Sequence, residues 1–132
     1  MGNWRDGRGT LTVGAGAEIG AEAGVEVGVG GEVDLEIAAS YGARRRGLLG
    51  RDGIDGALLI TPCGSVHTFR MRFAIDVAYL DRELTVLDVH TLRPGRLPPP
   101  RWRARHVLEA EAGAMAGWGL RVGTRVVVRT AG

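Results

Sequence analysis

Lysine is absent from this 132-residue sequence, and all 17 basic residues are arginine. The sequence has one cysteine, Cys63, so no disulfide can form within the chain and folding needs no oxidising compartment. No run of about 18 apolar residues occurs, and the first residues lack the apolar core of a signal peptide. These absences predict a cytoplasmic protein without a membrane-spanning helix.

Aromatic residues are scarce at 5%, whereas glycine occurs 22 times. Such a turn-rich composition favours many short strands over long helices. Apolar residues make up 45% of the chain, which is typical of a globular protein with one modest core. Residues 1–39 hold two arginines against seven acidic residues, and residues 40–132 hold fifteen against eight. The acidic first third can screen the basic remainder or compete with an anionic partner.

Apolar runs and alternating patterns predict about eight short strands. We expect strands at Thr10–Val13, Val33–Ala38, Ala57–Ile60, Val66–Met71, Ile75–Leu80, Leu84–Val89, Ala104–Glu109 and Arg125–Arg129. Short helical turns are expected at Tyr41–Leu49 and Ala112–Trp118, each followed by glycine. Many short strands with one or two brief helices are typical of a β-sandwich or barrel.

Residues 14–31 consist of glycine, alanine, valine, isoleucine and glutamate. The glutamates recur every four residues, a spacing that permits one helix face, but each interior glycine costs a helix about 1 kcal/mol relative to alanine. We therefore expect a flexible or loosely extended insertion. The chain is divided into residues 1–32, the first strand with this insertion, and residues 33–132, a single β-sandwich domain.

Deleting residues 14–31 should leave the fold largely intact, because the insertion supplies no predicted strand. Thermal or urea denaturation of the deletion variant should keep a cooperative transition. A large loss of cooperativity on deletion would contradict this expectation.

The stretch Ser65–Asp81 places a histidine, two arginines and an aspartate within a strand-like apolar pattern. Polar side chains among buried ones need partners, so the stretch is either a site or a polar brace. In a strand, His67 shares a face with Phe69 and Met71, which places it on the apolar side. We favour a core-edge histidine that hydrogen-bonds a backbone carbonyl, with a general base or ligand-binding residue as the alternative.

Two carboxylates share this ambiguity. Asp76 has apolar neighbours and is expected to accept hydrogen bonds from Arg70, Arg72 or backbone amides. Glu109 is expected to brace an arginine of the Arg44–Arg46 run. Paired carboxylates also suit acid–base work in a cleft, so both residues remain catalytic candidates.

Other catalytic or metal-binding arrangements are less well supported. Cys63 lies four residues before His67, as a nucleophile and its base can, but no signature of a cysteine enzyme surrounds it, so a buried thiol is favoured. His67, Asp76, His106 and Glu109 are suitable metal ligands without a motif spacing, so no metal site is predicted. No phosphate loop or dinucleotide fingerprint occurs, and no cofactor is predicted.

Arg101, Arg103 and Arg105 alternate with other residues around Trp102. If this stretch is extended, the three arginines line one face, which suits phosphate or single-stranded nucleic acid. Charge alone is weak support, so we favour a solvated edge that prevents strand aggregation over nucleic-acid binding.

Several motifs occur in order along the chain. They are Glu36-Ile-Ala-Ala, Arg46-Gly-Leu-Leu-Gly-Arg51, Gly56-Ala-Leu-Leu-Ile, Val66-His-Thr-Phe-Arg-Met-Arg-Phe-Ala-Ile-Asp-Val-Ala-Tyr-Leu-Asp81, His106-Val-Leu-Glu-Ala-Glu-Ala-Gly113 and Gly119-Leu-Arg-Val-Gly123. In these motifs the chain resembles the uncharacterised family Domain of Unknown Function 192, found in bacteria and archaea. The resemblance implies a jelly-roll-like β-sandwich and no established reaction. The family usually has glycine or tryptophan where Arg70 stands.

We therefore expect an all-β, jelly-roll-like sandwich that acts as a non-catalytic binding or accessory module. Its ligand surface is expected to involve His67, Arg70, Arg72, Asp76 and Glu109. The arginines would hold a polar or anionic ligand, Asp76 would orient an arginine, and His67 would donate a hydrogen bond. The partner would be a polar small molecule or a protein, rather than a membrane or nucleic acid. The alternatives are a hydrolytic enzyme using His67 with Asp76 or Glu109, with or without a metal, and a structural partner in a larger assembly.

Overall fold

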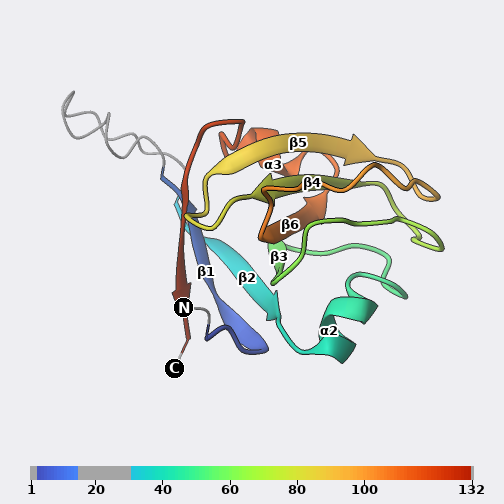
Figure 1. Cartoon of the computed structure of the whole chain (residues 1–132), viewed down its shortest axis with the longest axis horizontal. Coiled ribbons are helices and arrows are strands. Elements are labelled where there is room, and N and C mark those ends of the chain that lie inside the picture. The colour runs from blue at the N-terminus through green and yellow to red at the C-terminus, as the bar shows by residue number, and fades with distance from the viewer. Residues whose placement is uncertain (1–2, 15–30, 132) are drawn as a thin grey trace.

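Seven strands and two short helices make up the computed structural model, which describes residues 3–14 and 31–131 (Figure 1). The strands are β1 (Gly7–Val13), β2 (Val33–Ala38), β3 (Ala57–Ile60), β4 (Ile75–Leu80), β5 (Val86–Leu92), β6 (His106–Glu111) and β7 (Val126–Thr130). The helices are α2 (Tyr41–Arg46) and α3 (Ala114–Gly117). Within this part of the chain, no helix is long and apolar enough to cross a membrane.

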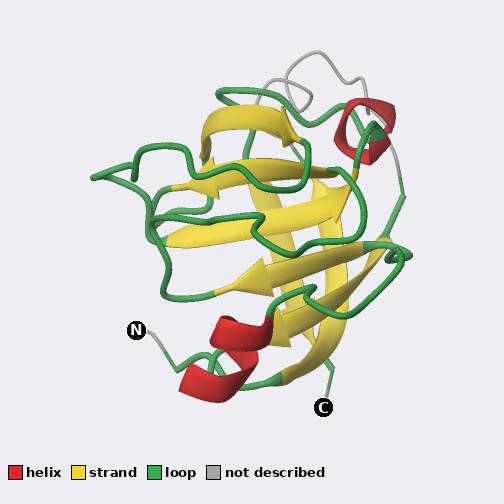
Figure 2. Ribbon diagram, turned by 90° about the vertical axis from the view of Figure 1, so that its right-hand side faces the viewer, coloured by secondary structure: helices red, strands yellow, loops and turns green. Residues whose placement is uncertain are grey.

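The strands form one sheet in the order β5-β4-β6-β3-β2-β1-β7, in which only β2 and β3 are parallel neighbours. The two ends of this order also approach each other, because Val86 N donates to Thr124 O at 2.8 Å and Val126 N donates to Leu84 O at 3.0 Å. The sheet therefore curls until its edges meet (Figure 2). The all-β prediction is confirmed. A jelly roll of two sheets is not confirmed, because the strands form one continuous sheet.

The central strands β3 and β4 are buried on both faces. Side chains that face into the curl, such as Leu59 and Ala78, form an inner core. Side chains that face outward, such as Leu58 and Tyr79, belong to a second, outer core. Because successive side chains of a strand point to opposite faces, a strand between two cores is apolar at most positions. This requirement explains the unbroken apolar sequence of β3.

The outer core is covered partly by a loop where the sequence predicted a strand. Residues Val66–Met71 join no sheet. Thr68, which is fully buried, ties them to another loop: its Oγ1 donates to Arg93 O at 2.7 Å and accepts from Arg96 N at 2.8 Å. Its backbone N also donates to Arg96 O at 2.8 Å. The strand prediction is wrong because the backbone of this segment hydrogen-bonds a neighbouring loop instead of a strand of the sheet.

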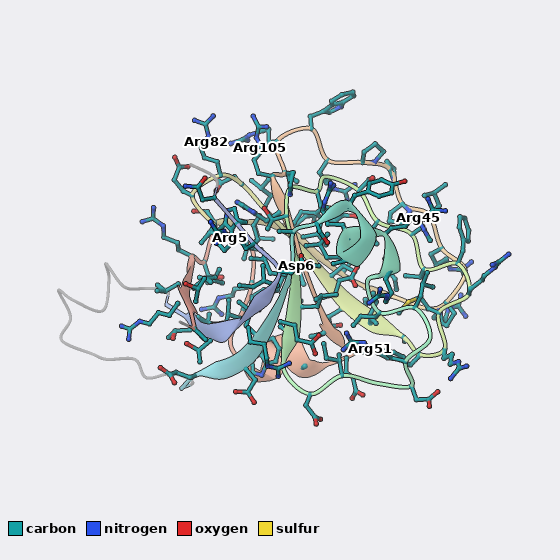
Figure 3. All side chains as sticks on the ribbon, turned by 90° about the horizontal axis from the view of Figure 1, so that it is seen from below. Arg5, Asp6, Arg45, Arg51, Arg82 and Arg105 are labelled. Carbon is teal, nitrogen blue, oxygen red and sulfur yellow. The ribbon has the colours of Figure 1, made fainter. Side chains whose placement is uncertain are left out.

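Asp6, labelled near the centre of Figure 3, fixes the start of α2 through its hydrogen bonds. Its carboxylate accepts from Ser40 Oγ at 2.6 Å and from the N atoms of Ser40 and Ala39 at 2.7 and 2.6 Å. These hydrogen bonds, led by that of the Ser40 hydroxyl, lower the pKa of Asp6. Ser40 in turn caps the helix by accepting from Ala43 N. The helix ends earlier than predicted because Gly47 adopts a φ of 49°, which glycine tolerates without strain.

The first strand belongs to the same sheet as the rest of the chain, since β1 lies between β2 and β7. Gly9 of β1 is required there, because a Cβ at this position would collide with the carbonyl oxygen of Arg129. The predicted insertion at residues 14–31 lies almost entirely outside the described residues. Strands β5 and β6 begin two residues later than predicted.

Candidate functional site

The two carboxylates of the predicted site lie on opposite faces of the sheet. Asp76 of β4 pairs with Ala110, a residue of the inner core. Glu109 of β6 lies between Leu58 and Val77, which belong to the outer core. Cross-strand partners share a face, so Asp76 points into the curl and Glu109 points outward. A single pocket cannot use both carboxylates.

Asp76 braces the inner face. It is only 3% exposed, and its carboxylate accepts hydrogen bonds from Thr91 Oγ1 at 2.6 Å, Gly113 N at 2.9 Å and Met115 N at 3.1 Å. Gly113 precedes α3 and has no side chain for capping, so Asp76 caps this helix from a neighbouring strand. No arginine contributes to this set of hydrogen bonds within residues 3–14 and 31–131.

Arg70 and Arg72 are exposed, and the structure does not bring them to Asp76. Arg72 Nη1 lies 3.1 Å from Asp52 Oδ1, in a surface ion pair of the kind that contributes about 0–1 kcal/mol. Arg70 has a φ of 66°, a left-handed conformation that favours glycine. Of the two residues expected here from the family resemblance, glycine fits this conformation without strain, whereas tryptophan gains nothing from it.

His67 is exposed, so the prediction that it lies on the apolar side of a strand is wrong. The buried residues of this loop are Val66, Thr68 and Met71. The backbone N of Phe69 donates to His67 Nδ1 at 3.2 Å, and the two rings stack with centroids 5.1 Å apart. The imidazole is therefore held by its neighbour and remains accessible to a ligand.

A cavity of about 300 Å³ opens between α2, the loop that carries His67 and the outer face of the sheet. Glu109 and His67 are the predicted site residues that line it, and we name it the Glu109 cavity. Helix α2 contributes three consecutive arginines, Arg44, Arg45 and Arg46, and Figure 3 shows Arg45 beside this helix. The other lining residues are Tyr41, Gly47, Leu48, Leu49, Ile60, Cys63, Ser65, Val66 and Met71.

Glu109 lies on the sheet side of this cavity and is only 5% exposed. Burial disfavours the charged carboxylate and raises the pKa of Glu109 to about 7. The predicted brace to the arginine run is not formed: Arg44 donates to two backbone carbonyls, and Arg45 donates to Tyr41 Oη. Among the residues that the structure describes, Glu109 has no hydrogen-bond partner. It is a carboxyl group whose charge changes near neutral pH.

Cys63 lines the same cavity but has the features of a structural thiol. Its Sγ donates to Ser65 O at 3.0 Å, and burial raises the pKa of the thiol. A thiol with a raised pKa is mostly protonated at neutral pH and is a poor nucleophile. The arrangement gives no support to a nucleophilic pair of Cys63 with His67.

Sequence reasoning missed a polar cluster beside β5. Arg101 donates to Asp88 Oδ2 through Nε at 3.0 Å and Nη2 at 2.8 Å, and Nη2 lies 2.9 Å from His90 Nε2. The guanidinium carbon also lies 4.8 Å from the ring centroid of Tyr79. Burial acts to raise the pKa of Asp88, but hydrogen bonds from Arg101 and His90 outweigh it and lower the pKa. Asp88 and His90 share one face of a strand, which is a signal that the sequence contained.

The expectation that Arg101, Arg103 and Arg105 line one extended face is wrong. Residues 101–105 form no strand, and Arg101 folds inward onto Asp88. Trp102 is 92% exposed at this turn. The three arginines therefore do not share one extended face.

The curled sheet and its covered outer face define a small all-β domain with a polar cavity. The family model of Domain of Unknown Function 192, described as "Uncharacterized ACR", matches residues 25–128. The chain belongs to this family, so the resemblance stated from its motifs is confirmed.

Curated relatives carry only a family name. A UPF0127 protein of Pyrococcus abyssi is 35% identical over 100 residues, which cover 72% of this chain and 86% of the relative. A UPF0127 protein of Pyrococcus horikoshii is 36% identical over 87 residues, which cover 62% of this chain and 76% of the relative. Both organisms are archaea. These names assign the family and no activity.

Two solved structures have a similar fold. One, from Sinorhizobium meliloti and provisionally described as a transcription regulator, has a TM-score of 0.73 at 16% identity and covers 96% of this chain and 98% of its own. The other is a protein of unknown function from Novosphingobium aromaticivorans, with a TM-score of 0.67 at 16% identity, covering 92% and 84%. At this identity the likeness shows the fold alone.

The Asp76→Ala variant should lose about 2–4 kcal/mol of unfolding free energy, because buried donors lose a charged acceptor and α3 loses its cap. Asp52→Ala is the matched control: it removes a carboxylate from an exposed ion pair and should cost less than about 1 kcal/mol. Urea denaturation measures both values. Equal, small losses in the two variants would show that Asp76 is not a brace.

Glu109 should make stability depend on pH. Its folded pKa of about 7 exceeds the ordinary value of 4.5, so the folded state holds the proton more tightly than the unfolded state. The resulting stability is fully present below about pH 4.5 and is lost as the pH rises to about 7. Relative to Glu109→Gln, the wild type should lose up to about 3 kcal/mol over this range.

Urea denaturation of the wild type and Glu109→Gln at pH 4.5, 6 and 8 measures this difference, since other titrating groups contribute equally to both proteins. A difference that stays constant across these pH values would mean that Glu109 ionises at its ordinary pKa.

Proposed function

We propose that this protein is a non-catalytic binding module whose ligand is a small hydroxylated anion held in the Glu109 cavity. The observation that carries the proposal is a buried carboxyl group without a described partner, facing a cavity rimmed by arginines. The carboxyl oxygens of Glu109 face the cavity and are not sealed from it, so a ligand in the cavity can reach them. A ligand hydroxyl would supply the partner that Glu109 lacks.

The arginines of α2 favour the anionic part of such a ligand. Guanidinium groups bind carboxylates and phosphates through paired hydrogen bonds. Arg44 and Arg45 are each oriented by a hydrogen bond to a neighbour, so they are partly preorganised at the rim. With a pKa of about 7, Glu109 is largely neutral in mildly acidic solution and then does not repel an anion.

The proposed ligand set differs from the one predicted from sequence. His67 and Glu109 stay, because both line the cavity. Asp76 leaves it because its oxygens are engaged on the other face. The arginines of α2 take the place of Arg70 and Arg72. The volume of the cavity is near the lower end of the range for small-molecule pockets, about 300–1,000 Å³.

A hydrolytic enzyme is the second candidate, and one observation favours it. A general acid–base group works best with a pKa near the working pH, and that of Glu109 is about 7. His67 lines the same cavity and would be the second group. No three histidine, cysteine, aspartate or glutamate side chains converge on a common point in residues 3–14 and 31–131, so this version is argued without a metal.

Nucleic-acid binding is not favoured, although one structure of similar fold is provisionally described as a transcription regulator. The two described helices have six and four residues. A recognition helix lies along the major groove and presents several side chains to the bases. Neither helix is long enough to do so.

Glycerol 3-phosphate and citrate should raise the melting temperature of the wild type, whereas glycerol, which lacks the anion, should not. A ligand at about 100 times its Kd adds about 2.7 kcal/mol, or a rise of about 10 °C in a domain of this size. Glu109→Ala should abolish the rise, and Glu109→Gln should keep it, because the amide is neutral and still hydrogen-bonds. Thermal-shift titration measures each value.

Arg103→Gln is the matched control for Arg45→Gln, since both replace an exposed arginine and only Arg45 lines the cavity. The control should bind as the wild type does, and Arg45→Gln should bind more weakly. No rise with either anion would contradict the proposal. Turnover of p-nitrophenyl acetate that Glu109→Gln abolishes would favour the hydrolase, because that variant cannot transfer a proton.

A further inference from the structure

A second cavity, of about 560 Å³, lies where β3 ends and β6 begins. Its lining includes Thr61 and Pro62 after β3, Arg105 and His106 at the start of β6, and Trp4 from the segment before β1. It shares no lining residue with the Glu109 cavity. We name it the Trp4 cavity.

His106 gives this cavity an imidazole of which one ring nitrogen has no described hydrogen-bond partner. The side chain belongs to a residue that is 7% exposed, and its Nδ1 lies 2.8 Å from Thr61 Oγ1. Burial lowers the pKa of His106, so the ring is neutral at pH 7. If the Thr61 hydroxyl donates to Nδ1, the ring proton resides on Nε2 and Nε2 is a donor; if it accepts from Nδ1, Nε2 is an acceptor. Nε2 has no hydrogen bond to any residue in the described ranges.

Two arginines stand at this cavity without a described carboxylate partner. Arg82 lies in the turn between β4 and β5, and Arg105 immediately precedes β6. Figure 3 shows their side chains next to each other and well away from Arg45. The nearby Asp81 accepts through one oxygen, Oδ1, from the backbone N atoms of Glu83 and Thr85, at 2.9 and 3.0 Å. Neither arginine forms an ion pair with a described residue.

Trp4 supplies a flat apolar wall. Its ring meets the imidazole of His106 edge-on, with centroids 5.5 Å apart and planes at 65°. The two rings therefore meet at a steep angle rather than stacking, and Pro62 adds an apolar surface to the same cavity. Indole faces stack well on planar aromatic groups. One cavity thus combines an aromatic wall, a buried imidazole and two unpaired guanidinium groups.

We propose that the Trp4 cavity binds a planar aromatic molecule that carries an anionic group. The aromatic part packs against Trp4 and Pro62, the anion binds Arg82 and Arg105, and Nε2 of His106 hydrogen-bonds a polar group of the ligand. An aromatic carboxylate and a nucleoside monophosphate share this chemistry. The site is independent of the Glu109 cavity, so either proposal can fail without the other.

NMR titration of the whole protein tests the proposal through its three tryptophan indole N–H signals. Trp4→Phe identifies the signal of Trp4. The probes are indole-3-acetate and adenosine 5′-monophosphate, with indole and adenosine as their uncharged matches. We expect the Trp4 signal to shift saturably with at least one anion, while the signals of Trp102 and Trp118 stay in place. Each uncharged match should bind at least tenfold more weakly.

Binding of indole-3-acetate would indicate an aromatic carboxylate as the ligand, and binding of adenosine 5′-monophosphate would indicate a nucleotide. Replacing both Arg82 and Arg105 by glutamine should raise the Kd of the anion at least tenfold, because the double variant lacks the two guanidinium groups. Both side chains are exposed, so the double variant should still fold. Arg103→Gln and Glu109→Gln should bind as the wild type does. The proposal is overturned if no probe shifts the Trp4 signal saturably, if the uncharged matches bind equally well, or if the double variant keeps the wild-type Kd.

Discussion

The burial of the central strands on both faces is the constraint on which the rest of this structure depends. Side chains of β3 and β4 point inward and outward in alternation, so curling of the sheet by itself buries only the inward-facing half of the side chains of these two strands. The outer half needs a cover, and burial of apolar surface is worth about 25 cal/mol per Å². Helix α2 and long loops provide it, and hydrogen bonds hold them: those of Thr68 on the loop, of Asp6 on α2 and of Arg101 on Asp88. The Glu109 cavity lies between this cover and the sheet, and the Trp4 cavity lies at the ends of β3 and β6.

Asp76 and Glu109 show how the two faces treat the same chemical group. Both are carboxyl groups on central strands, 3% and 5% exposed. Asp76 accepts three hydrogen bonds, which join β4, β5 and α3. Glu109 accepts none from a described residue, and its pKa rises to about 7. A buried carboxyl without partners destabilises a fold in its charged form. Its position in a cavity lined with arginines gives this cost a functional interpretation that Asp76 does not need.

Local pattern was sufficient where a residue's environment follows from its own strand. The sequence predicted the bounds of β2, β3 and β4 as the structure has them, because apolar runs and alternation report burial on one or both faces. It failed at Val66–Met71, where the same alternation serves a loop that hydrogen-bonds residues about 25 positions away. It also failed for His67, since exposure there depends on which side of the loop faces the sheet. Glu109 has no described hydrogen-bond partner because Arg44 and Arg45 across the cavity bind other groups. The sequences of α2 and β6 do not encode how far apart these two segments lie.

The role of an arginine in this protein depends on whether a carboxylate pairs with it. Arg51 pairs with Glu36, Arg72 with Asp52 and Arg101 with Asp88, so part of the charge is cancelled locally. With a formal net charge of +2, the chain has little long-range field, and exposed charges are screened within about 8 Å at physiological salt. Anion recognition must therefore be local, at arginines that lack a carboxylate and stand beside a buried polar group. The two cavities meet that condition with different buried groups, a carboxyl in one and an imidazole in the other, and the ligands proposed for them differ accordingly.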